Sequence, residues 1–256
     1  MKIIVITQDD LFYLGKHFDY LFHKLPRWVN LKGIIILKFS PFGKVDSTFN
    51  KIIKAYNVFG GKIFIHYLLK YIDAITFNRR YLIRSVMKKY FIPEITLVDS
   101  NINSDSSINQ LRRMDLDLII SISANQIFKR QILDIPKYGC INLHTASLPS
   151  YKGLMPTFWA LKNNEPEIGV SVFFMDEGID TGDIIVQKKV PVKSIDSLET
   201  MINKTKKVGM DAIIEAILKI NSGEVQTFRP SGEGTYYSFP TREDVRNFIN
   251  AGKKLW

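Results

Sequence analysis

Short apolar runs alternate along this chain with longer segments whose apolar residues recur every three or four positions. The short runs are rich in Ile, Val and Leu, which is typical of buried strands. The pattern predicts strands at KIIVIT (2–7), GIIILKF (33–39), ITLVD (95–99), LDLIISIS (116–123), CINLH (140–144), VSVFFM (170–175) and DIIVQKKVPV (183–192).

The segments with helical spacing lie mostly between these runs. Asp9 and Asp10 offer a cap for a first helix that ends near Lys24, before Pro26. Further helices are predicted from about Phe49 to Lys89, within NSDSSINQLRRM (103–114), from Ser197 to Asn221 and after the capping residues at 241–244.

Strands that alternate with helices predict an α/β protein with a doubly wound, mostly parallel, Rossmann-like sheet. Only seven residues separate the runs at 170–175 and 183–192, too few for a crossover helix, so these two strands should pair antiparallel. We expect a catalytic domain over residues 1–195, with a basic helical insertion at about 49–92. Residues 196–256 should form a C-terminal helix and a small strand and loop subdomain.

Composition narrows the class of protein. With one cysteine, Cys140, among 256 residues, the chain can form no intrachain disulfide and no Cys-rich metal site, so we expect no metal and a cytoplasmic location. No run approaches the roughly 18 apolar residues of a membrane span, and MKIIVITQDD does not resemble a signal peptide.

The net charge of +10 is concentrated in one segment. Nine Lys or Arg lie between Lys51 and Ile92, against the single acid Asp73. A basic surface suits phosphate groups of a nucleotide-linked substrate, a nucleic acid or an anionic membrane, and it is equally compatible with a well-solvated helix face.

Several chemistries lack their motifs. The first strand leads into Thr7-Gln8-Asp9-Asp10 and not into a glycine-rich dinucleotide turn. The sequence contains neither a Walker-type phosphate loop nor a G-x-S-x-G nucleophile turn. His17, His23 and His66 show no metal-ligand spacing, which leaves His144 as the histidine to explain.

Asn142 and His144 lie at the end of a predicted strand, where open α/β sheets bind their ligands. Residues two apart on a strand share a face, so the amide and the imidazole could donate together to an oxyanion. Asp180, in the turn between two strands, is a candidate to orient the imidazole and keep it protonated. An Asn-x-His pair at a strand end also occurs for structural reasons, so the pair alone does not decide.

Three separated blocks resemble the signature of the N10-formyltetrahydrofolate-dependent formyltransferase family. They are Asn142-Leu143-His144, then ASLPSYKG at 146–153, then DEGIDTGD at 176–183. The family's usual Ser-Leu after the histidine is Ala146-Ser147 here. This difference affects the loop and leaves the three residues Asn142, His144 and Asp180, called the trio below, unchanged. The resemblance implies that Asn142, His144 and Asp180 are catalytic and that N10-formyltetrahydrofolate is the formyl donor.

The resemblance also implies two cofactor-binding loops. These comprise Ser123, Ala124, Asn125, Gln126 and Ile127, extending to Phe128, together with Met175, Asp176, Glu177, Gly178 and Ile179. The subtype that it resembles most is the nucleotide-sugar N-formyltransferases of surface polysaccharides such as the O-antigen of lipopolysaccharide. Its substrates are 3- or 4-amino-dideoxy sugars on a nucleoside diphosphate, and the expected substrate-binding residues are Gln8, Asp9, Lys152, Met155, Pro156, Trp159, Tyr236 and Tyr237.

Other amines stay open, namely methionyl-tRNA and glycinamide ribonucleotide. The missing glycine-rich turn after the first strand disfavours the latter, and the short remainder after Val192 disfavours a tRNA-binding barrel. A non-catalytic nucleic-acid or membrane-surface binding module on the same fold is a further alternative. We expect no stable nucleic-acid complex, and a homodimer remains open.

Overall fold

A computed structural model describes residues 1–38, 53 and 56–256 of the chain. Its centre is a six-stranded sheet in the order β2-β1-β3-β4-β6-β7. The first four of these strands in spatial order are parallel, and β6 and β7 continue the sheet antiparallel. The strands of this sheet are β1 Lys2–Gln8, β2 Asn30–Leu37, β3 Leu118–Ile122, β4 Cys140–His144, β6 Glu167–Phe174 and β7 Ile184–Pro191. The predicted doubly wound α/β fold and the antiparallel pair are confirmed.

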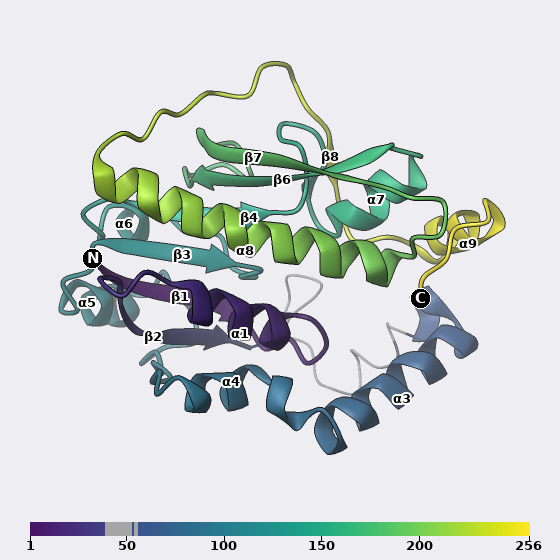
Figure 1. Cartoon of the computed structure of the whole chain (residues 1–256), viewed down its shortest axis with the longest axis horizontal. Helices are drawn as coiled ribbons and strands as arrows, with labels where there is room; N and C mark the ends of the chain where they lie inside the picture. The colour runs from purple at the N-terminus through teal and green to yellow at the C-terminus, as the bar shows by residue number, and fades with distance from the viewer. Residues whose placement is uncertain (39–52, 54–55) are drawn as a thin grey trace.

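Helices cover both faces of the sheet (Figure 1). On one face α1 Leu14–Lys24 and α8 Leu198–Ser222 share the larger apolar core with β1, β3, β4 and β6. On the other, α5 Asp105–Arg112 and α6 Arg130–Leu133 enclose a smaller core. The face of each strand residue follows from the alternation of side chains along a strand.

Local sequence accounts for the helix ends. The Ser197 side chain accepts a hydrogen bond from the Thr200 amide and caps α8, and Gly223 ends the helix in a left-handed conformation. Thr241 and Asp244 form the expected capping box of α9 Arg242–Asn250. At the first helix, the Asp10 carboxylate accepts from the amides of Phe12, Tyr13 and Leu14, so α1 begins four residues after it.

Two predictions were wrong. Residues 95–99 form no strand, since only an isolated bridge joins Ile34 to Glu94. The backbone groups that would pair with a neighbouring strand are bound by the side chain of Gln110 instead. Its oxygen accepts from the Val98 amide, and its nitrogen donates to the Thr96 carbonyl.

The prediction of one continuous helix from Phe49 to Lys89 is the second error. Its described part divides into α3 Gly61–Thr76, a 3₁₀ turn η1 Arg79–Tyr81 and α4 Ile83–Lys89. Its start near Phe49 lies outside the described residues. The break follows Asn78, whose amide donates to the Asp73 carboxylate and closes the end of α3.

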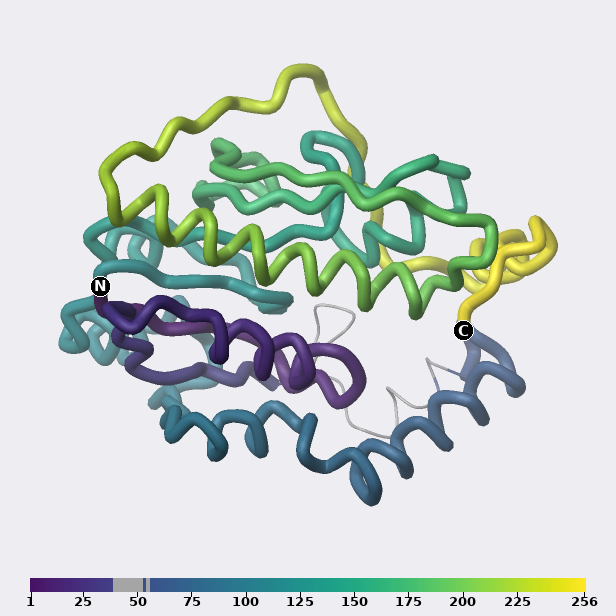
Figure 2. Tube along the Cα trace, viewed as in Figure 1, coloured from purple at the N-terminus to yellow at the C-terminus, as the bar shows by residue number. Residues whose placement is uncertain are grey.

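The C-terminal segment returns to the sheet's carboxyl edge, as the trace in Figure 2 shows. There β8 Tyr236–Tyr237 pairs in parallel with β5 Lys152–Gly153, next to α7 Pro156–Lys162. Among the described helices, none combines the length and the apolar character needed to cross a bilayer.

Candidate active site

The end of β4 presents Asn142 and His144 on one face of the sheet, together with Cys140. In the register, Asn142 lies opposite Ser121 on β3 and Phe173 on β6, and His144 lies opposite Ser171 on β6. The His144 side chain is buried, whereas Asn142 is only half-buried. Within the described part of the chain, the side-chain amide of Asn142 makes no hydrogen bond to the protein. Its two N–H groups can therefore donate to a ligand.

Asp180 reaches His144 from the turn between β6 and β7. Its Oδ2 lies 3.7 Å from Nδ1 of His144, and both side chains are largely buried. The same oxygen accepts a hydrogen bond of 2.8 Å from the backbone amide of Gly153. The structure therefore brings together the three residues that the sequence singled out and ties them to the 146–153 loop.

The other ring nitrogen of His144 is also engaged. Nε2 lies 2.7 Å from the carbonyl oxygen of Tyr151, an acceptor that requires a proton on Nε2. Both nitrogens thus face protein acceptors, and an N–H of His144 can reach an oxyanion only by sharing or leaving one of them. Sequence reasoning did not foresee this contact, because it comes from a loop carbonyl.

The turn that carries Asp180 is held by its own residues. Asp176 accepts hydrogen bonds from the Gly178 amide and from the Thr181 hydroxyl, at 3.0 and 2.6 Å. Gly182 lies against β6, where a Cβ atom would come 1.6 Å from the Phe174 carbonyl oxygen. A residue with a side chain at this position would push the turn, and Asp180 with it, away from the strand.

Ser171 braces the loop that follows His144, a role that no sequence motif predicted. Its fully buried hydroxyl donates to the Ala146 carbonyl at 2.7 Å. It accepts from the Gln187 amide at 2.9 Å and from the Leu148 backbone amide at 3.4 Å. The histidine strand, its loop and β7 are therefore joined through one hydroxyl group.

The segment expected to hold the folate begins at Ser123, in a left-handed conformation directly after β3. The Asn125 amide nitrogen donates to the Lys38 carbonyl, and its Oδ1 is buried with no partner in the described part of the chain. The side-chain oxygen of Gln126 accepts from the Ile102 amide, and its side-chain nitrogen donates to the Ser100 carbonyl. Ala124 and Met175 pack on the smaller core, while Ile127, Glu177 and Ile179 are exposed at the two loops.

Lys206 of α8 is a further charged group at this edge that sequence reasoning missed. Its Nζ donates to the Ser123 hydroxyl at 3.2 Å, and burial lowers the pKa of its amine while Asp10 opposes that shift. The sequence could have indicated this lysine, because it lies between Thr205 and Gly209, two residues of the buried face of α8.

The expected substrate-binding residues fall into two groups. Gln8 and Asp9 lie at the end of β1, where Asp9 forms an ion pair of 2.9 Å with Arg84. The other residues lie in or next to the pair of strands β5 and β8. Lys152 is in β5, Met155 and Pro156 are at the start of α7, Trp159 is within α7, and Tyr236 and Tyr237 form β8.

Within the second group the rings pack on one another. Tyr237 stacks on Trp159 and on Tyr151, with centroids 4.7 and 5.4 Å apart. The Trp159 indole is buried and donates to the Ser238 carbonyl, whereas Tyr236 is exposed. Of these rings, Tyr236 has the most surface free for a ligand.

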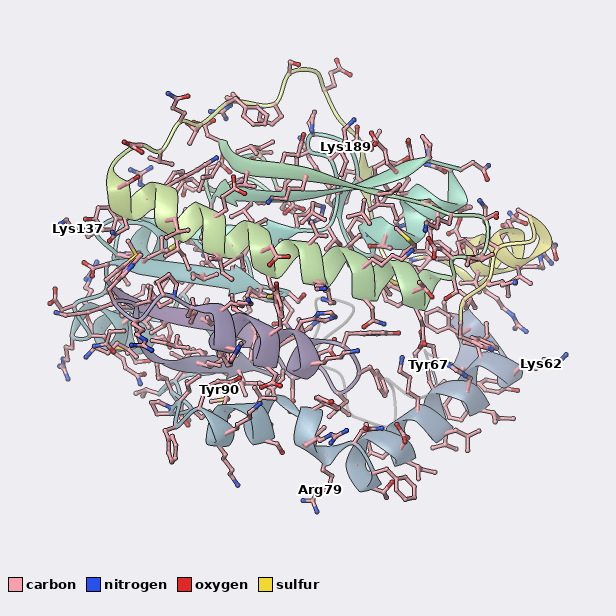
Figure 3. The ribbon with its side chains drawn as sticks, in the orientation of Figure 1. Lys62, Tyr67, Arg79, Tyr90, Lys137 and Lys189 are labelled. Carbon is pink, nitrogen blue, oxygen red and sulfur yellow. The ribbon has the colours of Figure 1, made fainter. Side chains whose placement is uncertain are left out.

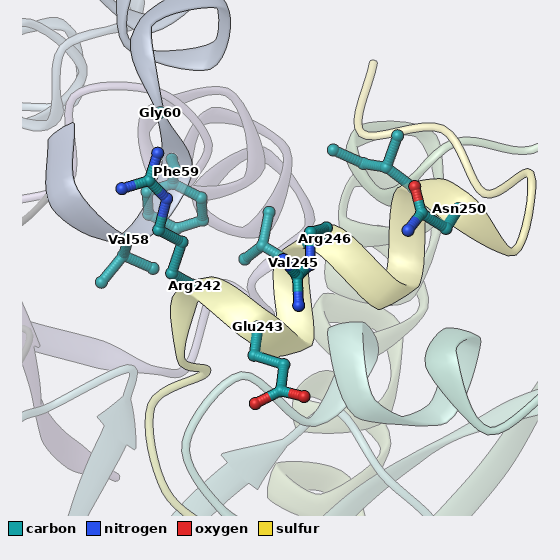
Figure 4. Close-up of a pocket in the computed structure, with 9 residues that line it drawn as sticks. Val58, Phe59, Gly60, Arg242, Glu243, Val245, Arg246 and Asn250 are labelled. Atoms are coloured by element: carbon teal, nitrogen blue, oxygen red, sulfur yellow. The ribbon is translucent and has the colours of Figure 1, made fainter.

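A cavity of about 460 Å³ lies beyond this aromatic strip, between the start of α3 and α9 (Figure 4). Phe59 lines it and packs edge-on against Phe239, two residues after β8. Arg242 and Arg246 also line it, and neither makes an ion pair within the part of the chain that the structure describes. The segment that contains Tyr237 therefore connects the strand beside Gly153 with this cavity, whose lining also includes the acid Glu243.

Comparison with known proteins adds the family. The family model described as formyl transferase matches residues 82–217. The chain is 37% identical over 153 residues to a methionyl-tRNA formyltransferase of Thermodesulfovibrio yellowstonii, which covers 59% of this chain and 50% of that protein. The chain therefore spans about half the length of the curated relatives it matches.

Two solved structures share the fold. A 4-N formyltransferase from Francisella tularensis superposes with a TM-score of 0.59 and 20% identity, over 97% of this chain and 78% of that one. Phosphoribosylglycinamide formyltransferase from Streptococcus pneumoniae gives a TM-score of 0.58 and 16% identity, over 86% of this chain and 98% of that one. At such identities the likeness concerns the fold.

Proposed function

Because this chain belongs to the formyl transferase family, we propose that it is an N-formyltransferase that moves a formyl group from N10-formyltetrahydrofolate to a primary amine. One observation carries the proposal. His144 and Asp180 are in contact beside the side-chain amide of Asn142, which has no hydrogen-bond partner among the described residues, at the carboxyl end of β4. That edge of an α/β sheet is where ligands bind.

The residues near the trio fit a folate. The unpartnered, buried Oδ1 of Asn125 can accept from an N–H group of a pterin. The exposed side chains of Ile127 and Ile179 offer apolar surface for a flat ring. When bound, the donor supplies the formyl carbon. A bond forms between this carbon and the amine nitrogen, the bond from the carbon to N10 breaks, and N10 takes up the proton that the amine loses.

The trio's part follows from its geometry. The amide of Asn142 donates to the formyl oxygen, which gains negative charge as the amine attacks. His144 adds a second donor once an N–H is released from, or shared with, Tyr151 or Asp180. Asp180 holds the imidazole from the Nδ1 side and is a base within reach of a proton that the amine loses through water.

For the acceptor we propose an amino sugar linked to a nucleoside diphosphate. The supporting feature is a series of contacts along the chain. Gly153, whose amide binds Asp180, pairs with Tyr237 of β8, and the segment after β8 leads to a cavity lined by Arg242, Arg246 and Glu243. Exposed Tyr236 can stack on a sugar or base. The guanidinium groups of Arg242 and Arg246, which form no ion pair with the described residues, suit a diphosphate. The basic residues of the 51–92 stretch support this acceptor less, because Arg84 and Lys89 already pair with acids of the protein.

Methionyl-tRNA is the second candidate, because relatives with 37% and 32% identity carry that activity in their names. It would use the exposed cations Arg79, Arg80 and Lys88 and would respond to salt through many weak contacts. The two candidates share the trio and the donor and differ in what binds beyond the amine.

A panel of acceptors incubated with N10-formyltetrahydrofolate separates them. It contains 3- and 4-amino-dideoxy sugars on nucleoside diphosphates, initiator methionyl-tRNA and glycinamide ribonucleotide, with formylation read by mass spectrometry. We expect transfer to a nucleotide-linked sugar; transfer to the tRNA alone would replace that acceptor, and transfer to none would contradict the proposal.

The cavity is tested by Arg242→Gln and Arg246→Gln. Each should raise KM for the nucleotide-linked sugar about tenfold or more, as loss of a charged hydrogen bond predicts, and leave the folate KM unchanged. Arg112→Gln and Arg113→Gln are matched controls, because these arginines are also exposed and free of ion pairs among the described residues. Equal effects in both pairs would move the diphosphate elsewhere.

A further inference from the structure

Helix α3 turns its apolar stripe outward. Ile65, Leu68, Leu69, Ile72 and Ile75 recur at the spacing of one helical face, and their exposed fractions run from 37 to 61%. Such a stripe normally faces a core, and monomeric proteins seldom leave one uncovered. We call these five residues the α3 stripe.

The opposite side of the helix faces the protein: Ile63 and Ala74 are buried there, and the polar contacts of Lys70 and His66 fix the orientation. Lys70 forms an ion pair with Glu199 at the start of α8, and its Nζ lies 4.2 Å from the centre of the Tyr13 ring. His66 lies 3.6 Å from the same carboxylate and stacks on Trp256. With these contacts made, the α3 stripe has no described part of the domain to pack against.

Cations stand at both ends of the stripe. Lys62 precedes it, and Arg79 and Arg80 follow it; Figure 3 shows Lys62 and Arg79 pointing away from the domain, while Tyr67 points inward. None of the three cations has an ion pair among the described residues. The one acid on the outer side, Asp73, accepts a hydrogen bond from the Asn78 amide.

We propose that the α3 stripe docks on the surface of an anionic phospholipid bilayer. An apolar helical face between basic residues buries itself at the boundary of headgroups and acyl chains, and anionic lipids neutralise the flanking charges. A second copy of the chain fits less well. Pairing α3 with its symmetry mate brings Lys62 against Lys62 when parallel, and against Arg79 and Arg80 when antiparallel, so like charges meet either way.

The test is co-sedimentation of the whole chain with vesicles of phosphatidylcholine, with or without phosphatidylglycerol. We expect partition to vesicles that contain phosphatidylglycerol and little to phosphatidylcholine alone. The double variant Leu68→Gln/Leu69→Gln should reduce that partition at least tenfold. Because both side chains are exposed, its thermal stability should equal that of the parent, which shows that the fold is intact.

Matched control variants distinguish an effect of the α3 stripe on vesicle binding from the effect of exposed apolar residues or charges in general. Val98→Gln/Ile195→Gln changes two exposed apolar residues elsewhere and should leave partition unchanged. Arg79→Gln/Arg80→Gln should weaken binding and flatten its salt dependence, whereas Arg112→Gln/Arg113→Gln should not. The proposal is overturned by absence of vesicle binding, by equal binding of the stripe variant, or by a dimer in light scattering that the stripe variant loses.

Discussion

Nε2 of His144 lies 2.7 Å from the carbonyl oxygen of Tyr151, seven residues further along the chain. A carbonyl accepts and cannot donate, so the proton must reside on Nε2, while Asp180 faces Nδ1 from 3.7 Å. The loop after β4 therefore sets which imidazole nitrogen carries the proton before any ligand binds. In the proposed mechanism the formyl oxygen competes with this carbonyl for an N–H of the imidazole, and the loop would then take part in the chemistry.

Replacing the two donors should affect turnover more than binding. His144→Ala and Asn142→Ala should each lower kcat about 10²- to 10³-fold with a small change in folate Kd, since the formyl oxygen gains charge only in the transition state. Steady-state kinetics on the identified acceptor and folate titration measure the two quantities. His23→Ala and Asn247→Ala, exposed on helices, are the controls. Near-parental turnover in either site variant would remove that residue from the trio.

Removing the charge of Asp180 should alter the pH dependence of turnover. Asp180→Asn can keep the hydrogen bond from the Gly153 amide through its amide oxygen, so the loop stays in place while the charge beside Nδ1 is lost. We expect kcat to fall about 10²-fold or more and the pH–rate profile to change shape. Glu224→Gln, at an exposed acid just after α8 that is not among the expected binding residues, should change neither. An unaltered profile in Asp180→Asn would contradict the assigned role.

Ser171→Ala should loosen the loop without touching the trio. The substitution leaves the Ala146 carbonyl without its buried donor and removes one of the two acceptors of the Gln187 side-chain amide, which keeps the Leu148 carbonyl. The loss should cost about 1–3 kcal/mol in the free energy of unfolding. Urea denaturation measures the loss. Ser106→Ala, on the exposed surface of α5, is the control and should cost little. If both variants are equally stable, the hydroxyl does not brace the loop.

Gly182→Ala tests the close approach under the Asp180 turn. Its Cβ would lie 1.6 Å from the Phe174 carbonyl oxygen, so the turn must shift, with a loss of about 1–3 kcal/mol in the free energy of unfolding. Gly61→Ala is the opposite case, because its Cβ would lie 3.8 Å from Tyr56 at the start of α3 and should be neutral or slightly stabilising. Thermal unfolding compares the two, and a tolerated Gly182→Ala would show that the turn has room.

Burial lowers the pKa of His17 to about 4, with Lys206 and Lys16 acting in the same direction. Between pH 6.5 and 4 the unfolded chain binds a proton at this site that the folded chain does not, so stability is lost as pH falls. From pH 7.5 to 5.0 the loss should be about 2 kcal/mol. His17→Gln should flatten this dependence in urea denaturation, and His23→Gln, exposed on the same helix, should not. An unchanged slope in His17→Gln would assign the acid sensitivity to other groups.

The sequence predicted the elements whose stability comes from their own pattern. α8 shows both its stripe and its caps at Ser197 and Gly223, and the β6–β7 pair follows from a connection too short for a crossover. Residues 95–99 have the composition of a strand, but Gln110, eleven or more residues away, decides where their backbone hydrogen bonds go. A distant side chain of this kind leaves no local trace.

The same limit applies to the site. The spacing of Asn142 and His144 and the turn at Asp180 could be recognised because each lies in one short block. The bracing by Ser171 and the approach of Lys206 depend on tertiary register, in which residues 25 and 83 positions apart along the chain meet. The outward turn of α3 could not be foreseen either, because its periodicity is the same whichever side faces the protein.

The pairing of β8 with β5 joins residues 84 positions apart, Lys152 with Tyr236, while the trio itself lies wholly within 142–180. A growing polypeptide that has reached Gly223 already holds the six strands of the main sheet and all three trio residues. It still lacks the strand that lies beside Gly153, whose amide anchors Asp180. During synthesis on the ribosome, all strands of the main sheet are therefore made before β8. The formyl transfer proposed above should begin only when β8 has been made and has closed against β5.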